Sequence, residues 1–515
     1  MPLPTNPRQP WPPTALDAVY DEMREHAAWY AASPQQLANF YSSASYTPTP
    51  TGHIWARETR ERLLVAVHMP LASDLAQMSS DLLFSEMPDM VVSHHPTTQQ
   101  RLEQLIENGN IMSRLLEGAE TCSALGGVYM RVVWDAHVTD EPMLTIMQPD
   151  TVVPEFAWGM LRAVTFWRVI AEEAGKYGQK DSIWRHLERH ELDAQGNGVI
   201  LHGVYKGTRD ELGVAMPLTS FAELATLEPI ILTHMPGLDV WYIPNMLPNR
   251  RNRGSAFGVS DYQGKESLFA SLDEAWTSLI TELQLCKVRI FVPEEYLQRL
   301  NGTARFAIDD QLFVPLNIDP MAAQQIDIKI QQPDLRVEKH LQLTQNLVRD
   351  IVTRCGYAPQ TFGLDIDGNA PSGTALRIRE RRSLTTMAKK QRYWKTPLQQ
   401  MLRSLLYLDA TVFDRPHPIP DSVAVTFADS VAPDPTELAT TVNLLKQSES
   451  ASEYIRLKTL HPDWTDQDIG QEQVRIREDK IRGLQLMSAV MGDGDPTGGV
   501  LDRLDTPKNG ADRTQ

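Results

Sequence analysis

Two long apolar stripes at helical spacing, separated by about 50 residues, constrain the fold of this chain more than any other feature. In each stripe an apolar or small residue recurs every three or four positions, which is the spacing that buries one face of an α-helix. The first stripe comprises Leu268, Leu272, Trp276, Leu279, Leu283 and Cys286, and the second comprises Val337, Leu341, Thr344, Val348, Ile351 and Cys355. The sequence therefore predicts two long helices, over residues 262–290 and 335–356, that flank an insertion of mixed strand and short-helix character. This layout is typical of a stalk that carries a tip, although two helices of an ordinary bundle would show the same periodicity.

A polar loop and a basic helix follow the second stripe. Residues 357–372 are rich in turn-forming residues and too long for a tight helical connection, which is typical of a functional loop. Ser372 is suited to cap a helix from Gly373 to about Leu408, inside which Pro397 is expected to cause a kink or a break. Its basic residues are Arg377, Arg379, Arg381, Arg382, Lys389, Lys390, Arg392, Lys395 and Arg403, against Glu380 alone among acids. The helix either binds DNA or contacts acidic neighbours, and the acidity of the whole chain favours the second interpretation.

The remaining segments divide into helical and strand-rich blocks. Residues 14–130 show helical spacing, including one expected helix from Gln99 to Ala124 that stops at a Gly-Gly pair. From Val128 the period changes to two, which predicts strands up to about residue 205. A short strand is expected at 423–427 and a helical domain at 435–490. Helices followed by a sheet favour an α+β fold over alternating strand–helix units.

The chain has 515 residues and a formal net charge of −17, which limits the classes of protein that it can belong to. Such acidity argues against a protein that binds nucleic acid by coating phosphates with Lys and Arg. Cys122, Cys286 and Cys355 are widely spaced and odd in number, so we expect no disulfide framework, no thiolate zinc site and a reducing cytoplasm. No run of about 18 apolar residues occurs, so no membrane span is expected.

The sequence does not match the motifs that would indicate catalysis. The sequence has no GxxxxGK[ST] phosphate loop, and the HLERH segment from His186 to His190 lacks the Glu that a zinc protease carries after its first His. Asp365, Asp367 and Asn369 match the first three ligand positions of a calcium loop, but the later Gly and Glu positions are not matched. The sequence therefore predicts no enzyme, no cofactor and no metal site.

Several short stretches carry a resemblance when they are taken in their order along the chain. They are Trp29-Tyr30 with Leu37 and Phe40-Tyr41, Ala124–Arg131, Val153–Phe156, Gly258–Tyr262 with Leu272–Trp276, and Gly356–Gly363 with Ser372–Leu376. In this order, and with the helix–insertion–helix–loop–helix layout, the sequence resembles the portal proteins of tailed double-stranded-DNA bacteriophages, in the siphophage-type family.

The resemblance implies a ring, typically of twelve subunits, at one capsid vertex, where it serves as the channel for DNA packaging and ejection. The implied fold is an α+β portal fold with a helical and β wing, a long-helix stem, a small α/β clip, a tunnel loop with a kinked long helix, and a helical crown. In chain order its parts are a Pro-rich arm (1–13), the wing (14–257), the first stem helix (258–290), the clip (291–334), the second stem helix (335–356), the tunnel loop (357–372), the kinked wing helix and strand (373–434), the crown (435–490) and a disordered tail (491–515).

The resemblance also implies partners and contact residues. The partners are double-stranded DNA read without sequence specificity, the terminase large subunit, head-completion or adaptor proteins, and the major capsid and scaffolding proteins, in a virion assembled in the host cytoplasm. The implied stem seam comprises Leu272, Trp276, Leu279, Leu283, Leu341, Leu347 and Ile351, since one subunit alone is not expected to bury such stripes. The implied tunnel-loop residues facing DNA are Thr361, Leu364, Asp365, Asp367 and Asn369, and the implied inter-subunit basic residues are Arg377, Arg381, Arg382 and Lys389. A monomeric phage adaptor or scaffold and a phage-encoded hydrolase are the alternatives.

Overall fold

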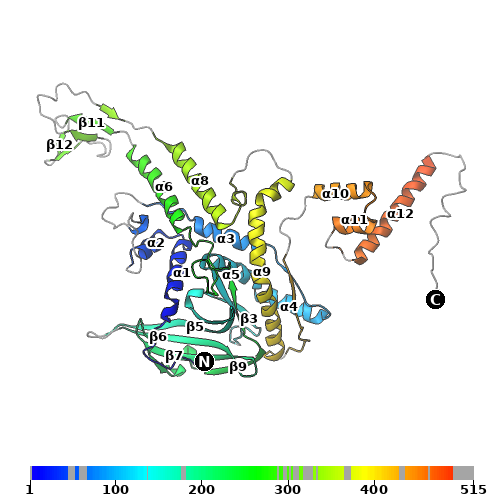
Figure 1. Ribbon diagram of the computed structural model, residues 1–515, viewed down its shortest axis with the longest axis horizontal. Coiled ribbons are helices and arrows are strands. Elements are labelled where there is room, and N and C mark those ends of the chain that lie inside the picture. The colour runs from blue at the N-terminus through cyan, green and yellow to red at the C-terminus, as the bar shows by residue number, and fades with distance from the viewer. Residues whose placement is uncertain are drawn as a thin grey trace. The chain divides into compact units, whose positions relative to one another are not determined.

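The computed structural model is shown in Figure 1. It describes residues 3–43, 53–56, 66–135, 137–175, 181–286, 289–293, 298–300, 303–305, 313–316, 329–331, 335–364, 373–413, 415–427, 435–461, 464 and 466–490. The chain divides into two compact units, Met1–Ala370 with Ala375–Ser430 and Pro371–Thr374 with Val431–Gln515. Helices and sheets both contribute substantially, so the expected α+β class is confirmed.

Among the described residues, five α-helices form the first part of the first unit. They are α1 (Asp17–Tyr30), α2 (Pro34–Tyr41), α3 (Leu71–Phe84), α4 (Pro96–Asn108) and α5 (Ile111–Leu125). The single helix expected from Gln99 to Ala124 is wrong, because Gly109 ends α4 and Asn110 has a φ of 47°, outside the right-handed helical region. The apolar faces of α1, α2 and α3 meet around the fully buried Trp29.

Two antiparallel sheets follow the helices. The first contains β2 (Gly127–Val133), β3 (Met143–Met147) and β10 (Val240–Pro244), in the order β10-β2-β3. The second runs in the order β4 (Val152–Ala157), β5 (Met160–Glu173), β6 (Ser182–Leu192), β7 (Asn197–Gly207), β8 (Val214–Met216), and β9 (Ile230–Pro236) also pairs with β7. The Pro-rich N-terminal segment packs on the second sheet, where Trp11 is buried against Leu187 and Tyr205.

The two predicted long helices lie side by side in the first unit (Figure 1). α6 (Glu266–Leu285) and α8 (Val337–Cys355) are each shorter than predicted at both ends. Between them the described residues form strands β11 (Arg289–Pro293), β12 (Gln298–Leu300), β13 (Thr303–Arg305), β14 (Phe313–Leu316) and β15 (Lys329–Gln331). Their order is β14-β11-β15, with β12 paired to β13.

One helix of 39 residues, α9 (Gly373–Thr411), completes the larger core. Trp394, Leu398 and Leu405 are buried there against α4, α5 and β2. The strand pair β1 (Asp89–Val91) and β16 (Ala424–Thr426) closes the same core. Pro397 lies inside the helix without breaking it, because packing on both sides of the proline holds the backbone helical.

The second unit is helical, as its apolar spacing predicts. It contains α10 (Pro435–Gln447), α11 (Glu453–Leu460) and α12 (Asp466–Val490). Lys480 of α12 pairs with Glu453 of α11 at 3.1 Å, and Ile469 is fully buried. The tail at 491–515 lies outside the described residues. Across the helices that the structure describes, none has the length and apolar character of a membrane span.

Candidate functional site

A buried ion pair joins several segments at the base of the α6–α8 pair, which is the end where α6 begins and α8 stops. Lys390 of α9 and Asp261 are 2% and 4% exposed, and the Lys390 ammonium lies 2.6 Å from the Asp261 carboxylate. The ammonium also donates to Ser79 Oγ at 2.7 Å, and the Tyr357 hydroxyl donates to Asp261 at 2.7 Å. We call this group the base node, and its members are Ser79, Ser123, Asn245, Asp261, Tyr357 and Lys390.

The charges of the base node stabilise each other. Burial alone would raise the pKa of Asp261, but Lys390 and the hydrogen bonds from Asn245 and Ser123 hold it below its usual range. Burial raises the pKa of Tyr357 well above its ordinary value, and the neighbouring Asp261 carboxylate adds to that effect, so the phenol stays a donor. A buried pair of this kind costs little while it is complete and much when one partner is removed.

Two glycines allow the backbone to approach the base node closely. Gly126 ends α5 with a φ of 88°, and a Cβ there would lie 2.8 Å from the Ser260 nitrogen. A Cβ at Gly258 would lie 2.2 Å from the Gly126 oxygen, so both positions require glycine. Three of the stretches that carried the resemblance, at 124–131, 258–262 and 356–363, therefore meet at one point in the fold.

A cleft of about 750 Å³ opens beside the base node, between α8, α9 and the segment around residues 246–265. Its lining includes the basic residues Arg250, Lys265, Arg354, Arg379, Arg381, Arg382 and Lys389. In the described lining Asp261 is the single acid, and it is already paired with Lys390. Within the described part of the chain none of the seven basic side chains forms an ion pair, and we call this site the basic cleft.

The predicted stem residues are buried at the base of α6 and α8 and exposed at the outer end. Leu272, Leu279 and Ile351 are at most 4% exposed, and Trp276 and Leu347 are partly buried. Leu283 is 41% exposed and Leu341 is 37% exposed. The expectation that one subunit cannot bury these stripes is wrong for the base, because α1, α2 and α3 cover it within the same chain.

An ionic contact holds the outer ends of the two helices together. Glu282 of α6 accepts hydrogen bonds from the Arg336 guanidinium at 3.0 Å and from His340 at 2.8 Å. Arg336 and His340 lower the pKa of Glu282 to about 2, so the carboxylate remains charged. The outer end is therefore held by polar contacts, while its leucines face solvent.

The predicted loop and basic-helix residues lie only partly within the described residues. Thr361 is in a short 3₁₀ helix, Pro359–Phe362, and its hydroxyl lies 2.8 Å from Ser383 Oγ of α9. Leu364 is partly buried, whereas Asp365, Asp367 and Asn369 lie outside the described residues, as does the side chain of Arg377. Arg381, Arg382 and Lys389 are exposed and line the basic cleft. The structure thus brings three of the four predicted basic residues to one site.

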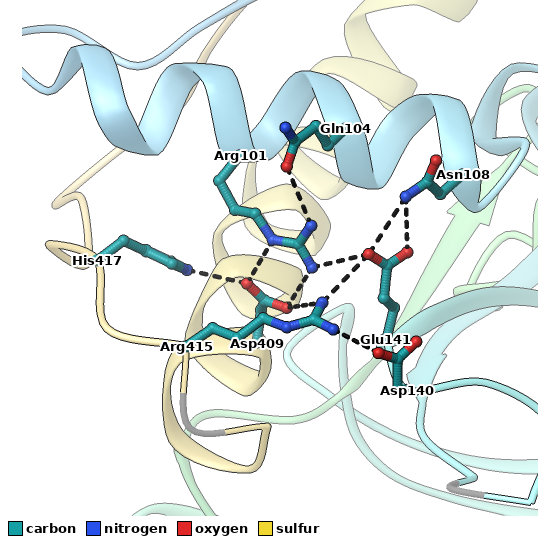
Figure 2. A network of polar contacts seen from close by, with 8 residues as sticks. All are labelled: Arg101, Gln104, Asn108, Asp140, Glu141, Asp409, Arg415 and His417. Atoms are coloured by element: carbon teal, nitrogen blue, oxygen red, sulfur yellow. Dashed lines mark hydrogen bonds and ion pairs between the residues drawn. The ribbon is translucent and has the colours of Figure 1, made fainter.

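A second polar network ties α4 to the end of α9, as Figure 2 shows. Arg101 binds Asp409 through two hydrogen bonds of 2.9 and 2.8 Å and reaches Glu141 at 2.9 Å. Arg415 contacts Glu141 at 3.2 Å and Asp140 at 2.6 Å, while His417 lies 3.2 Å from Asp409. Burial would raise the pKa of the fully buried Asp409, but Arg101 and Arg415 hold it below its usual range.

The HLERH segment lies in strand β6 and not in a helix. His190 is fully buried between Asp239 and Glu188, each 2.8 Å from a ring nitrogen. His186 stacks on His202 with their ring centroids 5.3 Å apart. Burial, together with the charge that His202 can carry, lowers the pKa of His186 to about 4. Among the described residues no cluster of His, Cys, Asp and Glu could hold a metal ion.

Sequence reasoning missed both the base node and the network around Asp409. One signal for the first was available, because Lys390 is three residues after Met387 and four before Trp394, on the buried face of α9. Its partner Asp261 is 129 positions away, and no local spacing pairs the two.

Similarity to known proteins extends over most of the chain. A profile of the family described as "Phage portal protein, SPP1 Gp6-like" matches residues 32–485. Among solved structures, "Neck of empty GTA particle computed with C6 symmetry" is similar at 11% identity, with a TM-score of 0.41 and coverage of 76% of this chain and 90% of that one. "Neck of native GTA particle computed with C12 symmetry" has the same identity and coverage and a TM-score of 0.38. No curated protein matches the sequence.

A family match over this much of the chain defines its class, which is structural rather than enzymatic. The chain belongs to the SPP1 Gp6-like family of phage portal proteins, and the resemblance seen in the sequence is confirmed. A portal role follows for the molecule as a whole.

Proposed function

We propose that this chain forms a closed ring, typically of twelve subunits, at one vertex of a phage capsid. The observation that carries the proposal is the exposed outer end of the α6–α8 pair. Leu283, Leu341 and Leu343 are 41%, 37% and 50% exposed there in a single subunit. Repetition around a ring axis would bring each such surface against a neighbouring copy, which would remove it from water.

In this proposal the segments have the roles of portal parts. Residues 14–257 form the wing, the segments 258–290 and 335–356 the stem, and 435–490 the crown. The clip at 291–334 docks the terminase large subunit during packaging and head-completion or adaptor proteins afterwards. The terminase supplies ATP hydrolysis, while major capsid and scaffolding proteins surround the ring during assembly in the host cytoplasm.

The proposed channel conducts double-stranded DNA without sequence specificity. Residues 258–376 contain 16 acidic and 10 basic residues, a balance that repels phosphate mildly. The tunnel loop, with Thr361, Leu364, Asp365, Asp367 and Asn369, faces the DNA. The basic residues Arg377, Arg381, Arg382 and Lys389 contact neighbouring subunits, so few of their charges remain for phosphate.

The oligomeric state of the purified chain tests the proposal. Native mass spectrometry and particle imaging at micromolar concentration should detect closed rings with a single dominant subunit number. Only monomers and dimers under these conditions would contradict the ring and favour a monomeric adaptor or scaffold.

A further inference from the structure

We propose that neighbouring subunits meet through opposite charges, the basic cleft of one subunit receiving the carboxylate face of α1 from the next. This inference rests on the proposed ring and adds to it the contact that sets which faces meet. The partner is a second copy of this chain, recognised by its carboxylates.

The basic cleft is a concentration of positive charge in an acidic protein. Seven basic side chains line a cavity of about 750 Å³, in a chain with a net charge of −17. Arg354, Arg379, Arg381, Arg382 and Lys389 are exposed, and no described carboxylate forms an ion pair with any of the seven. Like charges lining one concave surface repel each other and focus a positive potential, which attracts a surface of opposite charge.

Helix α1 presents the opposite charge. It carries four carboxylates, Asp17, Asp21, Glu22 and Glu25, against Arg24 as its one Lys or Arg. Asp17 is exposed. Among the residues that the structure describes, Asp21 pairs with the exposed Arg24 on its own helix, a contact that contributes little to stability. Both side chains are therefore available to a partner, whereas Glu22 already holds Arg251 at 3.1 Å.

The two charged surfaces lie on different elements of one subunit, so each can meet the other surface on a neighbouring copy. In Figure 1, α1 lies on the α6 side and α9 on the α8 side of the base of the helix pair. A closed ring is built from heterologous contacts, in which one face of each subunit meets a different face of the next. The acidic face of α1 and the basic cleft are two different surfaces of one subunit, which adjoin where Gln263 of the cleft lining donates to Glu22 of α1. DNA phosphates could also occupy the basic cleft, and the experiment separates that occupant from a second copy.

Charge reversal on each surface tests the contact. The cleft variant carries Arg381→Glu and Arg382→Glu, and the α1 variant carries Asp17→Lys and Asp21→Lys. Each variant alone brings like charges together, so the protein concentration for half-assembly should rise at least about tenfold, since every 1.4 kcal/mol lost per contact is a factor of ten. An equimolar mixture of the two should recover rings in which the variants alternate, because every contact is then between opposite charges. Native mass spectrometry would show equal numbers of the two subunits in each mixed ring.

Matched controls keep the outcomes distinct. Arg392→Glu with Lys395→Glu reverses two exposed charges of α9 outside the basic cleft and should leave rings unchanged. Thermal unfolding of each variant would show that its subunit is folded. Normal rings from both reversed variants, or no recovery in the mixture, would overturn this contact while the proposed ring remains. Normal rings from the cleft variant with a reduced salt dependence of duplex binding would identify the occupant as DNA. Absence of rings from the unaltered chain would contradict the proposed function itself.

Discussion

At the scale of single residues, the strongest dependence is expected at Lys390. Lys390→Met would leave the buried Asp261 charge without its partner, at a cost of about 3–5 kcal/mol in the free energy of unfolding. Lys389→Met, at the exposed neighbouring position, should change that free energy by no more than about 0.5 kcal/mol. Chemical denaturation of both variants measures the difference. Combining Lys390→Met with Asp261→Asn should recover part of the loss, and equal stability of the two lysine variants would contradict the importance of the ion pair.

His190 gives the fold a dependence on alkaline pH. Burial alone would lower the pKa of His190, but Asp239 and Glu188 outweigh burial and raise it to about 9. A raised pKa means that the imidazolium stabilises the folded state fully below about pH 6.5 and loses this contribution as the pH rises through 9.

The midpoint of thermal unfolding should therefore fall between pH 7 and pH 10. Asp239→Asn removes the charge that raises the pKa of His190 most and should move this fall to lower pH. Glu172→Gln, at an exposed position of β5, should leave the curve unchanged. A flat profile across this range in the unaltered chain would show that His190 is not charged when folded.

At the scale of elements, the two ends of α6 should respond differently to a new charge. Leu279 is 4% exposed, so Leu279→Asp places a carboxylate in the subunit's own core and should unfold the region, at a cost of several kcal/mol. Leu283 is 41% exposed, so Leu283→Asp should leave the subunit folded and impair ring formation. Circular dichroism reports the fold and native mass spectrometry the rings. Leu279→Met keeps the volume and apolar character and should preserve both; normal rings from Leu283→Asp would exclude it from the seam.

The sequence predicted the elements well where their signal is local. The stripes of α6 and α8 repeat every three or four residues, and such periodicity survives in the fold. The break between α4 and α5 was missed because the apolar spacing continues across it, although Gly109 ends α4 and Asn110 has a left-handed backbone. The depth of burial along α6 was also missed, since periodicity identifies an apolar face but not which element covers it. Long-range partners such as Asp261 and Lys390 depend on the whole topology and have no local signature.

At the scale of the whole molecule, the proposed ring is expected to bind duplex DNA weakly because it is acidic. Each Lys or Arg that contacts phosphate releases counterions and adds salt-dependent affinity, so a conducting channel should offer few such contacts. With a net charge of −17 per chain, we expect dissociation constants no tighter than about 10⁻⁴–10⁻⁶ M at physiological salt. Duplex binding to assembled rings, measured across a salt series, checks this expectation. Nanomolar binding with a steep salt slope would contradict a passive channel.

The base node has a mechanical consequence for the proposed channel. α6 has 20 residues and is therefore about 30 Å long. At its N-terminal end, which we call its foot, Lys390 of α9 donates to Asp261, just before α6, and to Tyr357, just after α8. A load applied to the far end of this lever becomes a torque at the foot. Apolar contacts can slide under torque, whereas a buried ion pair with fixed hydrogen-bond directions resists rotation. The lever is thus anchored where a twist would be largest, and a push at the tip should turn α8 and α9 together.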